Sequence, residues 1–312
     1  MNTIGVVLRE PLHLELDMLE MTPPAPGDLV VDVEWTGIST GTERLLWSGH
    51  MPPFPGMGYP LVPGYESVGR ITSAGFDCNL SIGQRVFVPG ARCFGEVRSL
   101  FGGAAAQLVV PAARVTAIDE NWGERGTLLA LAATAHHALA AAGGDMPDCI
   151  VGHGVLGRLL ARVAIALGGE PPTVWERDPN RVEGALGYRV LDPADDEERN
   201  FRVIYDASGD ASLLNYLIAR LAPGGEIVLA GFYSEQLSFA FPPAFMREAR
   251  IRVAAEWRPS DLLAVRDLVA AGRLSLEGLI SHRQQVSQAA SAYRTAFDDP
   301  TCLKMILDWR SR

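Results

Sequence analysis

A glycine-rich segment in the middle of this 312-residue chain carries the residue types that bind phosphate groups. It follows a short apolar run, Cys149 to Val151, and precedes apolar residues that recur at helical spacing. A strand, a glycine turn and a helix in this order leave backbone N–H groups free at the helix start, where a pyrophosphate can bind. The candidate cofactor-binding residues of this segment are Gly152, Gly154, Val155, Leu156 and Gly157.

An acidic residue at a suitable distance supports this interpretation. Glu176 ends an expected second strand, 173–176, and lies 24 residues after Gly152. A carboxylate at this point accepts hydrogen bonds from the ribose 2′-hydroxyl of a dinucleotide and repels a 2′-phosphate, which favours NAD over NADP. Arg177 favours the opposite choice, because a guanidinium can hold that phosphate. A purely structural turn is the alternative for the glycines. We predict that the chain binds NAD.

Two more candidate positions follow later strands. Ser208 and Gly209 come after the expected strand 201–205, and Gly231 comes after the expected strand 226–230. In parallel α/β sheets, ligands bind at the carboxyl ends of the strands. We therefore expect Ser208 and Gly231 near the cofactor. The alternative is that they are ordinary loop residues.

The elements that must position these residues divide the chain into three segments. Residues 117–254 alternate strands with helices, such as 126–142 and 211–221, which predicts a doubly wound parallel sheet of the Rossmann type. Residues 255–312 are too short for a core of their own, and we expect them to return to the first segment. Residues 1–116 are rich in glycine, proline and short β-like runs. These expected strands are Ile4–Leu8, Leu29–Trp35, Ser67–Thr72, Arg85–Val88 and Ala106–Val110.

The longest irregular stretch of the first segment runs from residue 47 to residue 63. It is rich in proline and carries large apolar side chains, which would be costly to leave in water. Two interpretations remain open: a small satellite core under a loop, or one wall of an apolar pocket for a large flat ligand. The apolar side chains are those of Trp47, Met51, Phe54, Met57 and Tyr59.

Charge and composition exclude several classes of function. A net charge of −10 without a basic block argues against nucleic-acid binding. No run reaches the ~20 apolar residues of a membrane span, and the first residues do not form a secretory signal. The four cysteines are scattered, which argues against a zinc cluster or a redox dithiol. We expect a cytoplasmic protein with an α/β fold of two domains.

Several motifs resemble those of the medium-chain dehydrogenase/reductase superfamily, and the resemblance runs along nearly the whole chain. GISTGTE at 37–43 is similar to the family's G-I-C-G-T-D/E, and GYESVG at 64–69 is similar to its G-H-E-x-x-G. The resemblance implies a GroES-like catalytic domain followed by a Rossmann domain. The remaining similar segments are GQRV at 83–86, TAHHAL at 134–139, and LISHR at 279–283 with Tyr293, Phe297 and Lys304.

The positions of the family's catalytic zinc ligands hold other residues in this chain. The cysteine's place falls on Ser39 or Thr40, the histidine's on Tyr65, and the third ligand's on Ala130. Neutral hydroxyls are poor zinc ligands beside thiolate and imidazole. We therefore predict that no catalytic zinc is present.

The resemblance extends to an activity and to site residues. Residues 37–49 and 51–64 are similar to members that act in bacteriochlorophyll biosynthesis, which implies oxidation of a 3-(1-hydroxyethyl) group on a chlorin or bacteriochlorin to 3-acetyl. Without zinc, a side chain must take the alcohol's proton. Tyr65 is the first candidate, provided that a neighbour lowers its pKa, with Ser39 or Thr40 beside it. The resemblance gives Thr42 a relay role, while Glu66 either orients Tyr65 or pairs with an arginine.

Two other functions remain open on the sequence. A zinc-free quinone or enoyl reductase that uses NAD(P)H would also lack the metal ligands. A non-catalytic nucleotide-binding scaffold for pigment-handling enzymes would lack them as well. The expected partner in the favoured case is a macrocyclic small molecule, and a homodimer is common in the superfamily.

Overall fold

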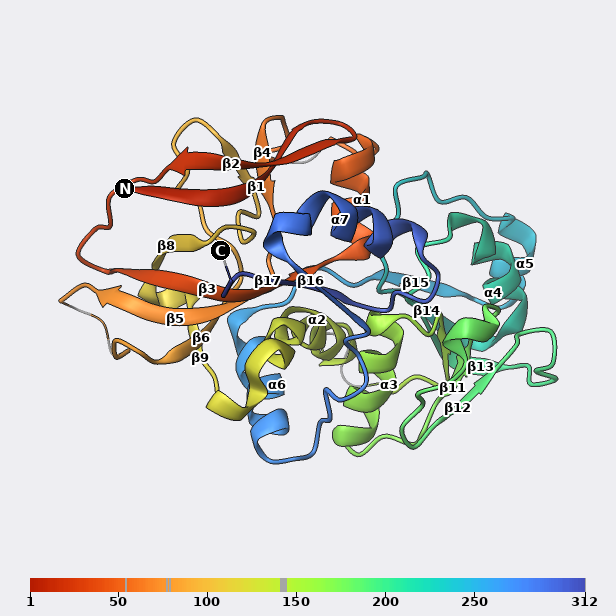
Figure 1. The fold of residues 1–312 in the computed structure, drawn as a ribbon. Coiled ribbons are helices and arrows are strands. Elements are labelled where there is room, and N and C mark those ends of the chain that lie inside the picture. Colours follow the sequence, from red (N-terminus) through yellow and green to blue (C-terminus); the bar gives the residue numbers. More distant parts are fainter. Residues whose placement is uncertain (54, 77, 79, 141–144, 312) are drawn as a thin grey trace. The chain divides into compact units, whose positions relative to one another are not determined.

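The computed structural model describes residues 1–53, 55–76, 78, 80–140 and 145–311, and it divides into two compact units. Unit 1 contains residues 1–130 and 277–312, and unit 2 contains residues 131–276 (Figure 1). The boundaries of these two units differ from those of the predicted segments, which were 1–116, 117–254 and 255–312. The three-segment division stays a prediction about which parts fold together.

Unit 1 is built on two sheets with an apolar core of valine, leucine and alanine side chains. The smaller sheet has the order β2-β1-β4-β7, and the larger has the order β16-β17-β3-β5-β6-β9 with β8 also paired to β3. The strands of the smaller sheet are β1 (Asn2–Glu10), β2 (His13–Glu20), β4 (Leu61–Pro63) and β7 (Arg98–Leu100). The strands of the larger sheet are β3 (Asp28–Ile38), β5 (Ser67–Ala74), β6 (Arg85–Val88), β8 (Gln107–Pro111), β9 (Thr116–Ala117), β16 (His282–Gln285) and β17 (Met305–Asp308).

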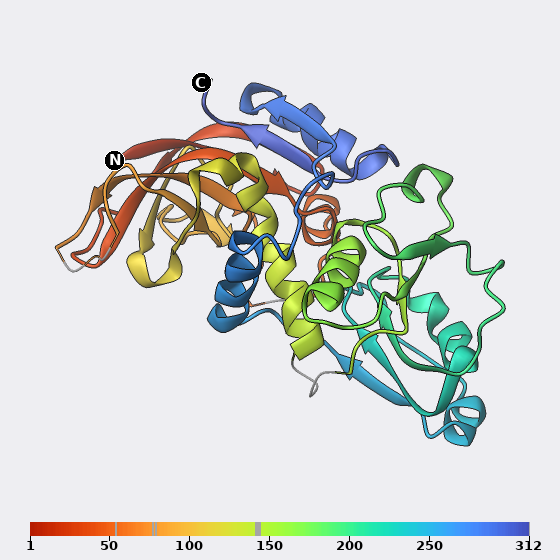
Figure 2. The ribbon, with the colours of Figure 1, turned by 90° about the horizontal axis from the view of Figure 1, so that it is seen from below.

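The C-terminal residues complete the larger sheet of unit 1. β17 pairs antiparallel with the end of β3, where Met305 lies opposite Ile38. Figure 2 shows the blue C-terminal strand beside red and orange strands from the beginning of the chain. Helix α7 (Ala289–Asp298) buries Ala292, Tyr293 and Phe297 in the core of this unit. Residues about 270 positions apart in the sequence therefore meet at the end of β3.

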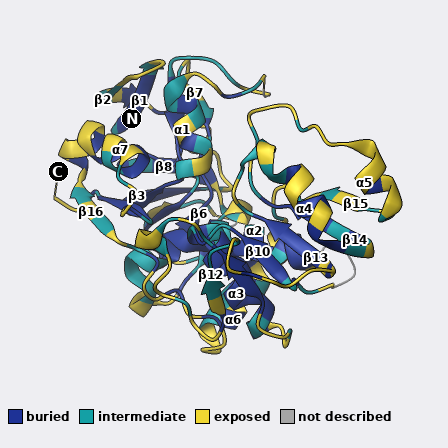
Figure 3. Ribbon diagram, turned by 90° about the vertical axis from the view of Figure 1, so that its right-hand side faces the viewer, coloured by how far each residue is buried: buried dark blue, intermediate teal, exposed yellow. Residues whose placement is uncertain are grey.

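Unit 2 holds a parallel sheet in the order β12-β11-β10-β13-β14-β15. Chain order reverses at β10, which gives the switch point of a doubly wound sheet and confirms the predicted fold class. Figure 3 shows β10 and β13 as buried and α5 as largely exposed. The strands are β10 (Cys149–Val151), β11 (Thr173–Trp175), β12 (Arg189–Leu191), β13 (Phe201–Asp206), β14 (Leu221–Leu229) and β15 (Arg250–Val253). The helices of unit 2 are α3 (Val155–Ala166), α4 (Leu214–Arg220), α5 (Phe241–Met246) and α6 (Pro259–Ala270), and α2 (Leu129–Ala140) begins in unit 1.

One helix lies in the segment that the sequence suggested was only strands and loops. Helix α1 (Thr40–Ser48) begins directly after β3 and ends at Gly49, whose φ of 76° is left-handed. Its first residues have low helix propensity, so the local sequence favours a loop. Leu46 is fully buried in a small apolar cluster, and this tertiary packing stabilises the helix.

Candidate active site

Three hydroxyl groups of unit 1 meet where β3 ends and α1 begins. The hydroxyls of Ser39 and Tyr65 are hydrogen-bonded to each other, and the hydroxyl of Thr42 lies 3.4 Å from that of Tyr65. Ser39 is buried, whereas Tyr65 and Thr42 are half-buried. Thr40 is the first residue of α1, and its hydroxyl is not part of this set. The structure thus brings together Ser39, Thr42 and Tyr65 of the predicted residues.

Tyr65 is a neutral phenol in this environment. Burial and the nearby carboxylate of Glu66 raise its pKa well above the ordinary value, although the hydrogen bonds from Ser39 and Thr42 act in the opposite direction. The sequence interpretation required a neighbour that lowers this pKa, and the net shift is the reverse. Tyr65 can therefore pass a proton on, but it is not a ready-made phenolate base.

Glu66, which follows Tyr65, forms a buried ion pair with a lysine. The two Glu66 oxygens accept hydrogen bonds from the Lys304 ammonium at 2.9 and 2.8 Å, and both residues are at most 1% exposed. The third donor of Lys304 goes to the carbonyl of Ile38 at 3.1 Å. The sequence interpretation offered an arginine as the partner. The partner is instead Lys304, which bonds both Ile38, the residue before Ser39, and Glu66, the residue after Tyr65.

Two supporting residues of this site were missed from the sequence. Lys304 is the only lysine of the chain and lies in the family-like C-terminal segment, and these two features were the available signal. Glu43 is 1% exposed and accepts a hydrogen bond from the Tyr293 hydroxyl at 2.6 Å. Its place in a family-like motif was noted, but no spacing rule connects residues 43 and 293.

The apolar stretch at 47–63 forms a satellite core. Met51 is buried together with Leu46 and Leu61, and the Tyr59 hydroxyl donates to the carbonyl of Leu46. Trp47, Met57 and Tyr59 are partly buried against the same cluster, while Phe54 lies outside the described residues. The first of the two interpretations is the one that these contacts support.

The glycine turn of unit 2 has the geometry that phosphate binding requires. Gly152 has a left-handed φ of 94°, and a Cβ on Gly157 would lie 1.8 Å from the carbonyl oxygen of Gly152. A Cβ on Gly154 would meet nothing within 4 Å, so the space beside it is open. Gly154 is the N-cap of α3, and Val155 and Leu156 begin the helix. The open side of the turn therefore presents helix N–H groups, and a dinucleotide pyrophosphate fits there.

Glu176 is held against the glycine turn. One carboxylate oxygen accepts from the backbone N–H of His153 at 2.9 Å, and the other accepts from those of Arg177 and Asp178, each at 2.9 Å. Arg177 itself is exposed. The carboxylate is therefore held beside the glycine turn, and its orientation is fixed by backbone donors.

His153 lies inside the motif but is a structural residue. Its ring is fully buried and bonds the carbonyl of Arg181 at 2.6 Å and the hydroxyl of Tyr188 at 2.8 Å. Burial lowers the pKa of His153 to about 4, so the ring is neutral near pH 7. The imidazole therefore links the glycine turn to the segment that contains Arg181 and Tyr188.

Ser208 and Gly231 lie beside the glycine turn. A Cβ on Gly152 would come within 3.4 Å of the Ser208 backbone, and one on Gly231 would come within 2.9 Å of the Gly209 nitrogen. The hydroxyl of Ser208 donates to Asp206 at 2.6 Å, and this bond fixes the loop. The loops after β10, β13 and β14 thus converge at the carboxyl edge of the sheet, and the nearness of Ser208 and Gly231 to a cofactor stays a prediction.

Comparison with known proteins identifies the family. Residues 25–120 match the model of the alcohol dehydrogenase GroES-like domain. The chain is 57% identical over 311 residues to the 2-desacetyl-2-hydroxyethyl bacteriochlorophyllide A dehydrogenase of Rhodobacter capsulatus, with 99% of each chain covered. It is also 57% identical to the enzyme of that name from Cereibacter sphaeroides, over 100% of this chain and 99% of the relative. The chain belongs to the bacteriochlorophyllide A dehydrogenase family.

Structural comparison agrees with the wider superfamily. An alcohol dehydrogenase of Escherichia coli, solved in complex with NADH, superposes with a TM-score of 0.83 at 21% identity, and 98% of this chain and 99% of the other are covered. This likeness, together with the GroES-like domain match, agrees with the fold that the resemblance implied. As a member of the bacteriochlorophyllide A dehydrogenase family, the chain is an oxidoreductase.

The zinc positions of the superfamily do not fit a metal in this family member. Ser39, Thr40 and Tyr65 offer neutral oxygens, and the Ala130 side chain offers no donor atom. In the described part of the chain, no three or more His, Cys, Asp and Glu residues are grouped so that they could hold a metal ion. The hydroxyls of Ser39 and Tyr65 are instead hydrogen-bonded to each other, and Ala130 is fully buried.

The adjacent histidines of α2 have a structural partner. The Nδ1 atoms of His136 and His137 bond the two oxygens of Asp261 at 2.8 and 2.9 Å. Asp261 also accepts from the backbone N–H of Arg258, the N-cap residue of α6. Both histidines therefore join α2 to α6, and a packing role accounts for them.

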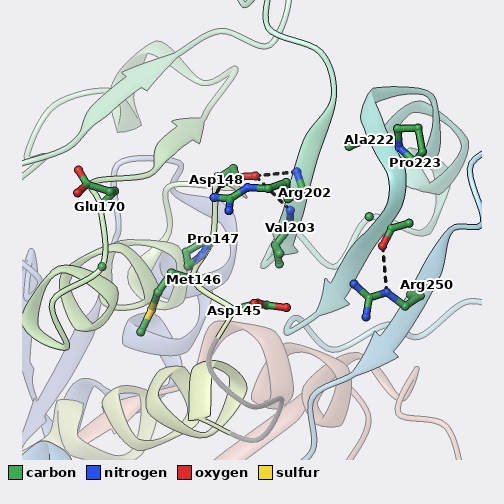
Figure 4. A pocket seen from close by; sticks show the side chains of 13 residues that line it. Asp145, Met146, Pro147, Asp148, Glu170, Arg202, Val203, Ala222, Pro223 and Arg250 are labelled. Atoms are coloured by element: carbon green, nitrogen blue, oxygen red, sulfur yellow. Dashed lines mark hydrogen bonds and ion pairs between the residues drawn. The ribbon is translucent and has the colours of Figure 1, made fainter.

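A pocket of about 500 Å³ opens at the opposite edge of the unit 2 sheet (Figure 4). Three of its charged side chains are already engaged, because Asp148 accepts from the Arg202 guanidinium at 2.7 Å and Arg250 donates to the carbonyl of Gly224 at 3.0 Å. It lies at the amino-terminal ends of β10 and β13, whereas ligands of this fold bind beyond the carboxyl ends. The glycine turn remains the candidate cofactor site.

Gly157→Ala is expected to damage both the turn and cofactor binding. Its methyl group would overlap the Gly152 carbonyl, and forced overpacking costs about 1–3 kcal/mol of unfolding free energy. The matched control is Gly154→Ala, which has room for a methyl group and should keep wild-type stability while it weakens NAD binding. Urea denaturation and an NAD titration measure the two quantities. A Gly157→Ala protein of wild-type stability would contradict this geometry.

No helix that the structure describes is long and apolar enough to cross a membrane. The cysteines at 78, 93, 149 and 302 are free thiols.

Proposed function

We propose that this chain oxidises the 1-hydroxyethyl group of a (bacterio)chlorophyllide to an acetyl group, with NAD as the hydride acceptor and without a catalytic metal. The observation that carries the proposal is the 57% identity, over essentially the whole chain, to two dehydrogenases named for this type of substrate. The hydroxyl cluster at the former metal positions supports the metal-free chemistry.

The reaction requires two bonds to break at one carbinol. The C–H bond breaks with both electrons, the O–H bond releases a proton, and a C=O bond forms. A bound nicotinamide supplies the acceptor for the hydride. The protein must hold the alcohol and take the proton.

We propose that Tyr65 accepts the proton of the alcohol and passes its own proton on to a neighbouring group. Because its pKa is raised, its oxygen accepts the alcohol proton only as its own proton passes to a neighbouring hydroxyl. Ser39, which is hydrogen-bonded to it, and Thr42 at 3.4 Å are the available neighbours, and the partly exposed Thr42 would release its own proton to solvent water as it receives the one from Tyr65. Glu66 has its oxygens engaged by Lys304, so its proposed role is to orient Tyr65.

The proposed cofactor is NAD, held at the glycine turn. Gly154 leaves room for the pyrophosphate, and the α3 N-terminus supplies N–H donors. Glu176 lies beside the turn and would accept from the ribose 2′-hydroxyl while repelling a 2′-phosphate. NADP could compete with NAD at this site, because the exposed guanidinium of Arg177 could bind its 2′-phosphate.

A spectral assay tests the reaction. Purified protein, freed of metal by a chelator, is mixed with NAD and a 3-hydroxyethyl chlorophyllide, and the long-wavelength pigment band is followed together with NADH absorbance. A red shift that matches NADH formation supports the proposal. Reduction of a quinone or enone by NADPH without pigment oxidation would favour the reductase alternative. Binding of both ligands without turnover would favour the scaffold.

Replacement of Glu176 tests the choice of cofactor. Glu176→Ala removes the proposed 2′-hydroxyl acceptor and the repulsion of a 2′-phosphate, so the variant should bind NAD more weakly and NADP more strongly. The ratio of kcat/KM with the two cofactors measures the change, and Arg177→Ala in the same background is the control for phosphate attraction. An unchanged NAD affinity in Glu176→Ala would remove the argument.

Location and assembly complete the proposal. The free thiols suit a reducing compartment, and we infer a cytoplasmic protein. A homodimer is also proposed, from its frequency in the superfamily, and size-exclusion chromatography with light scattering would test it.

A further inference from the structure

Glu43 is a buried acid next to the hydroxyl cluster, and both of its oxygens are matched to donors. The backbone N–H of Ser39 donates to one oxygen at 2.9 Å, and the hydroxyl of Tyr293 donates to the other at 2.6 Å. The side chain is 1% exposed, and that of Tyr293 is equally buried. A buried carboxyl group with both oxygens engaged is held in one orientation.

The hydrogen bonds around Ser39 explain what this orientation does. Ser39 is the N-cap residue of α1, where a serine hydroxyl normally accepts a hydrogen bond from a backbone N–H of the first turn. Among the residues that the structure describes, the Ser39 hydroxyl makes no such bond, and it bonds the Tyr65 hydroxyl instead. Glu43, the fourth residue of the helix, accepts from the Ser39 backbone N–H, which is the bond that a glutamate at the third helical position makes in a capping box. The Ser39 hydroxyl is thereby left for Tyr65.

We propose that Glu43 is a positioning residue, which holds the Ser39 backbone so that the Ser39 hydroxyl stays hydrogen-bonded to Tyr65. The inference rests on the proposed function, in which Tyr65 passes the alcohol proton to a neighbouring hydroxyl. Glu43 acts through the backbone of Ser39, and its effect is on geometry. The other side of Ser39 is fixed separately, since Lys304 holds the preceding carbonyl of Ile38 at 3.1 Å.

The environment of Glu43 identifies the conservative variant. Burial raises the pKa of its carboxyl group to about 7; Glu66 acts in the same direction, while Lys304 and the two hydrogen bonds act against it. The site therefore accepts a neutral side chain near pH 7. Glutamine keeps an oxygen for the Ser39 N–H and turns its amide toward the Tyr293 oxygen, whereas leucine of similar size offers neither.

The experiment compares Glu43→Leu, Glu43→Gln and Tyr293→Phe for kcat, for KM of pigment and NAD, and for thermal stability. Tyr293→Phe is the matched control, because it removes a hydrogen bond to the same carboxylate but leaves the bond to Ser39. A displacement near 1 Å at a reacting group can cost about 10²-fold in rate. We expect kcat to fall about 10²-fold in Glu43→Leu with both KM values unchanged, and to stay near wild type in the other two variants.

Two readouts separate the inference from the proposed function. In protein labelled with ¹³C at the Cζ atoms of tyrosine, the NMR signal of Tyr65 is assigned by its absence from the Tyr65→Phe spectrum. We expect the chemical shift of this signal to change in Glu43→Leu and to stay the same in Glu43→Gln. If Tyr65→Phe keeps its turnover but the Cζ signal behaves as expected, the proton role fails and the positioning role stands. Equal kcat losses in Glu43→Leu and Tyr293→Phe, or an unshifted Tyr65 signal in Glu43→Leu, would overturn the inference.

Discussion

Tyr65→Phe is expected to lower kcat about 10²–10⁴-fold, the range over which a positioned proton acceptor contributes to catalysis. The phenyl ring keeps the edge-on contact with Phe101, whose ring centroid lies 5.4 Å from that of Tyr65, so the fold should be preserved. The alcohol would lose the oxygen that takes its proton, while NAD binding at the glycine turn would not change. Single-turnover formation of NADH, measured with saturating pigment, gives the rate of the chemical step.

Tyr59→Phe is the matched control for the loss of a phenolic hydroxyl in the same unit. Its hydroxyl donates to the carbonyl of Leu46 in the satellite core and has no part in the cluster around Tyr65. We expect a small loss of stability and a wild-type kcat. If Tyr65→Phe also turns over at the wild-type rate, then Tyr65 is not the proton acceptor, and the identity of the base must be sought elsewhere.

Lys304→Met is expected to reduce the free energy of unfolding by about 3–5 kcal/mol, because it leaves the carboxylate of Glu66 buried without a cation. Turnover should fall as well, since Lys304 also holds the carbonyl that precedes Ser39. Guanidinium denaturation measures the stability. The double variant Lys304→Met/Glu66→Gln removes the stranded charge and should recover part of the loss.

Arg283→Met provides the comparison with an exposed pair of the same C-terminal segment. Its partner is Glu124, and the arginine side chain is 54% exposed, so the expected loss is about 0–1 kcal/mol. Since Lys304 is the only lysine, a sample labelled with ¹⁵N at lysine gives a single Nζ signal. Slow exchange of that signal with water would report the buried pair in the native protein. Rapid exchange, or equal losses in the two variants, would contradict the burial of Lys304.

The glycine turn could be predicted because its determinants are close together in the chain. Gly157 lies five residues from the Gly152 carbonyl that its missing side chain avoids, and Glu176 follows the next strand. A turn between a strand and a helix has few solutions, so glycine spacing alone constrains it. The hydroxyl-bearing residues of the candidate site could also be identified from the sequence, because each lies in a family-like motif. These residues are Ser39, Thr42 and Tyr65.

The sequence by itself therefore determined the fold class, the glycine turn and the absence of family zinc ligands at positions 39, 65 and 130. Only the tertiary structure decided what surrounds Tyr65. Glu43 meets Tyr293 across 250 residues of sequence, and Glu66 meets Lys304 across 238. Such pairs form because the C-terminal strand returns to β3, and no local period or spacing encodes that return. The burial that raises the pKa of Tyr65 and of Glu43 likewise depends on side chains packed from several distant segments.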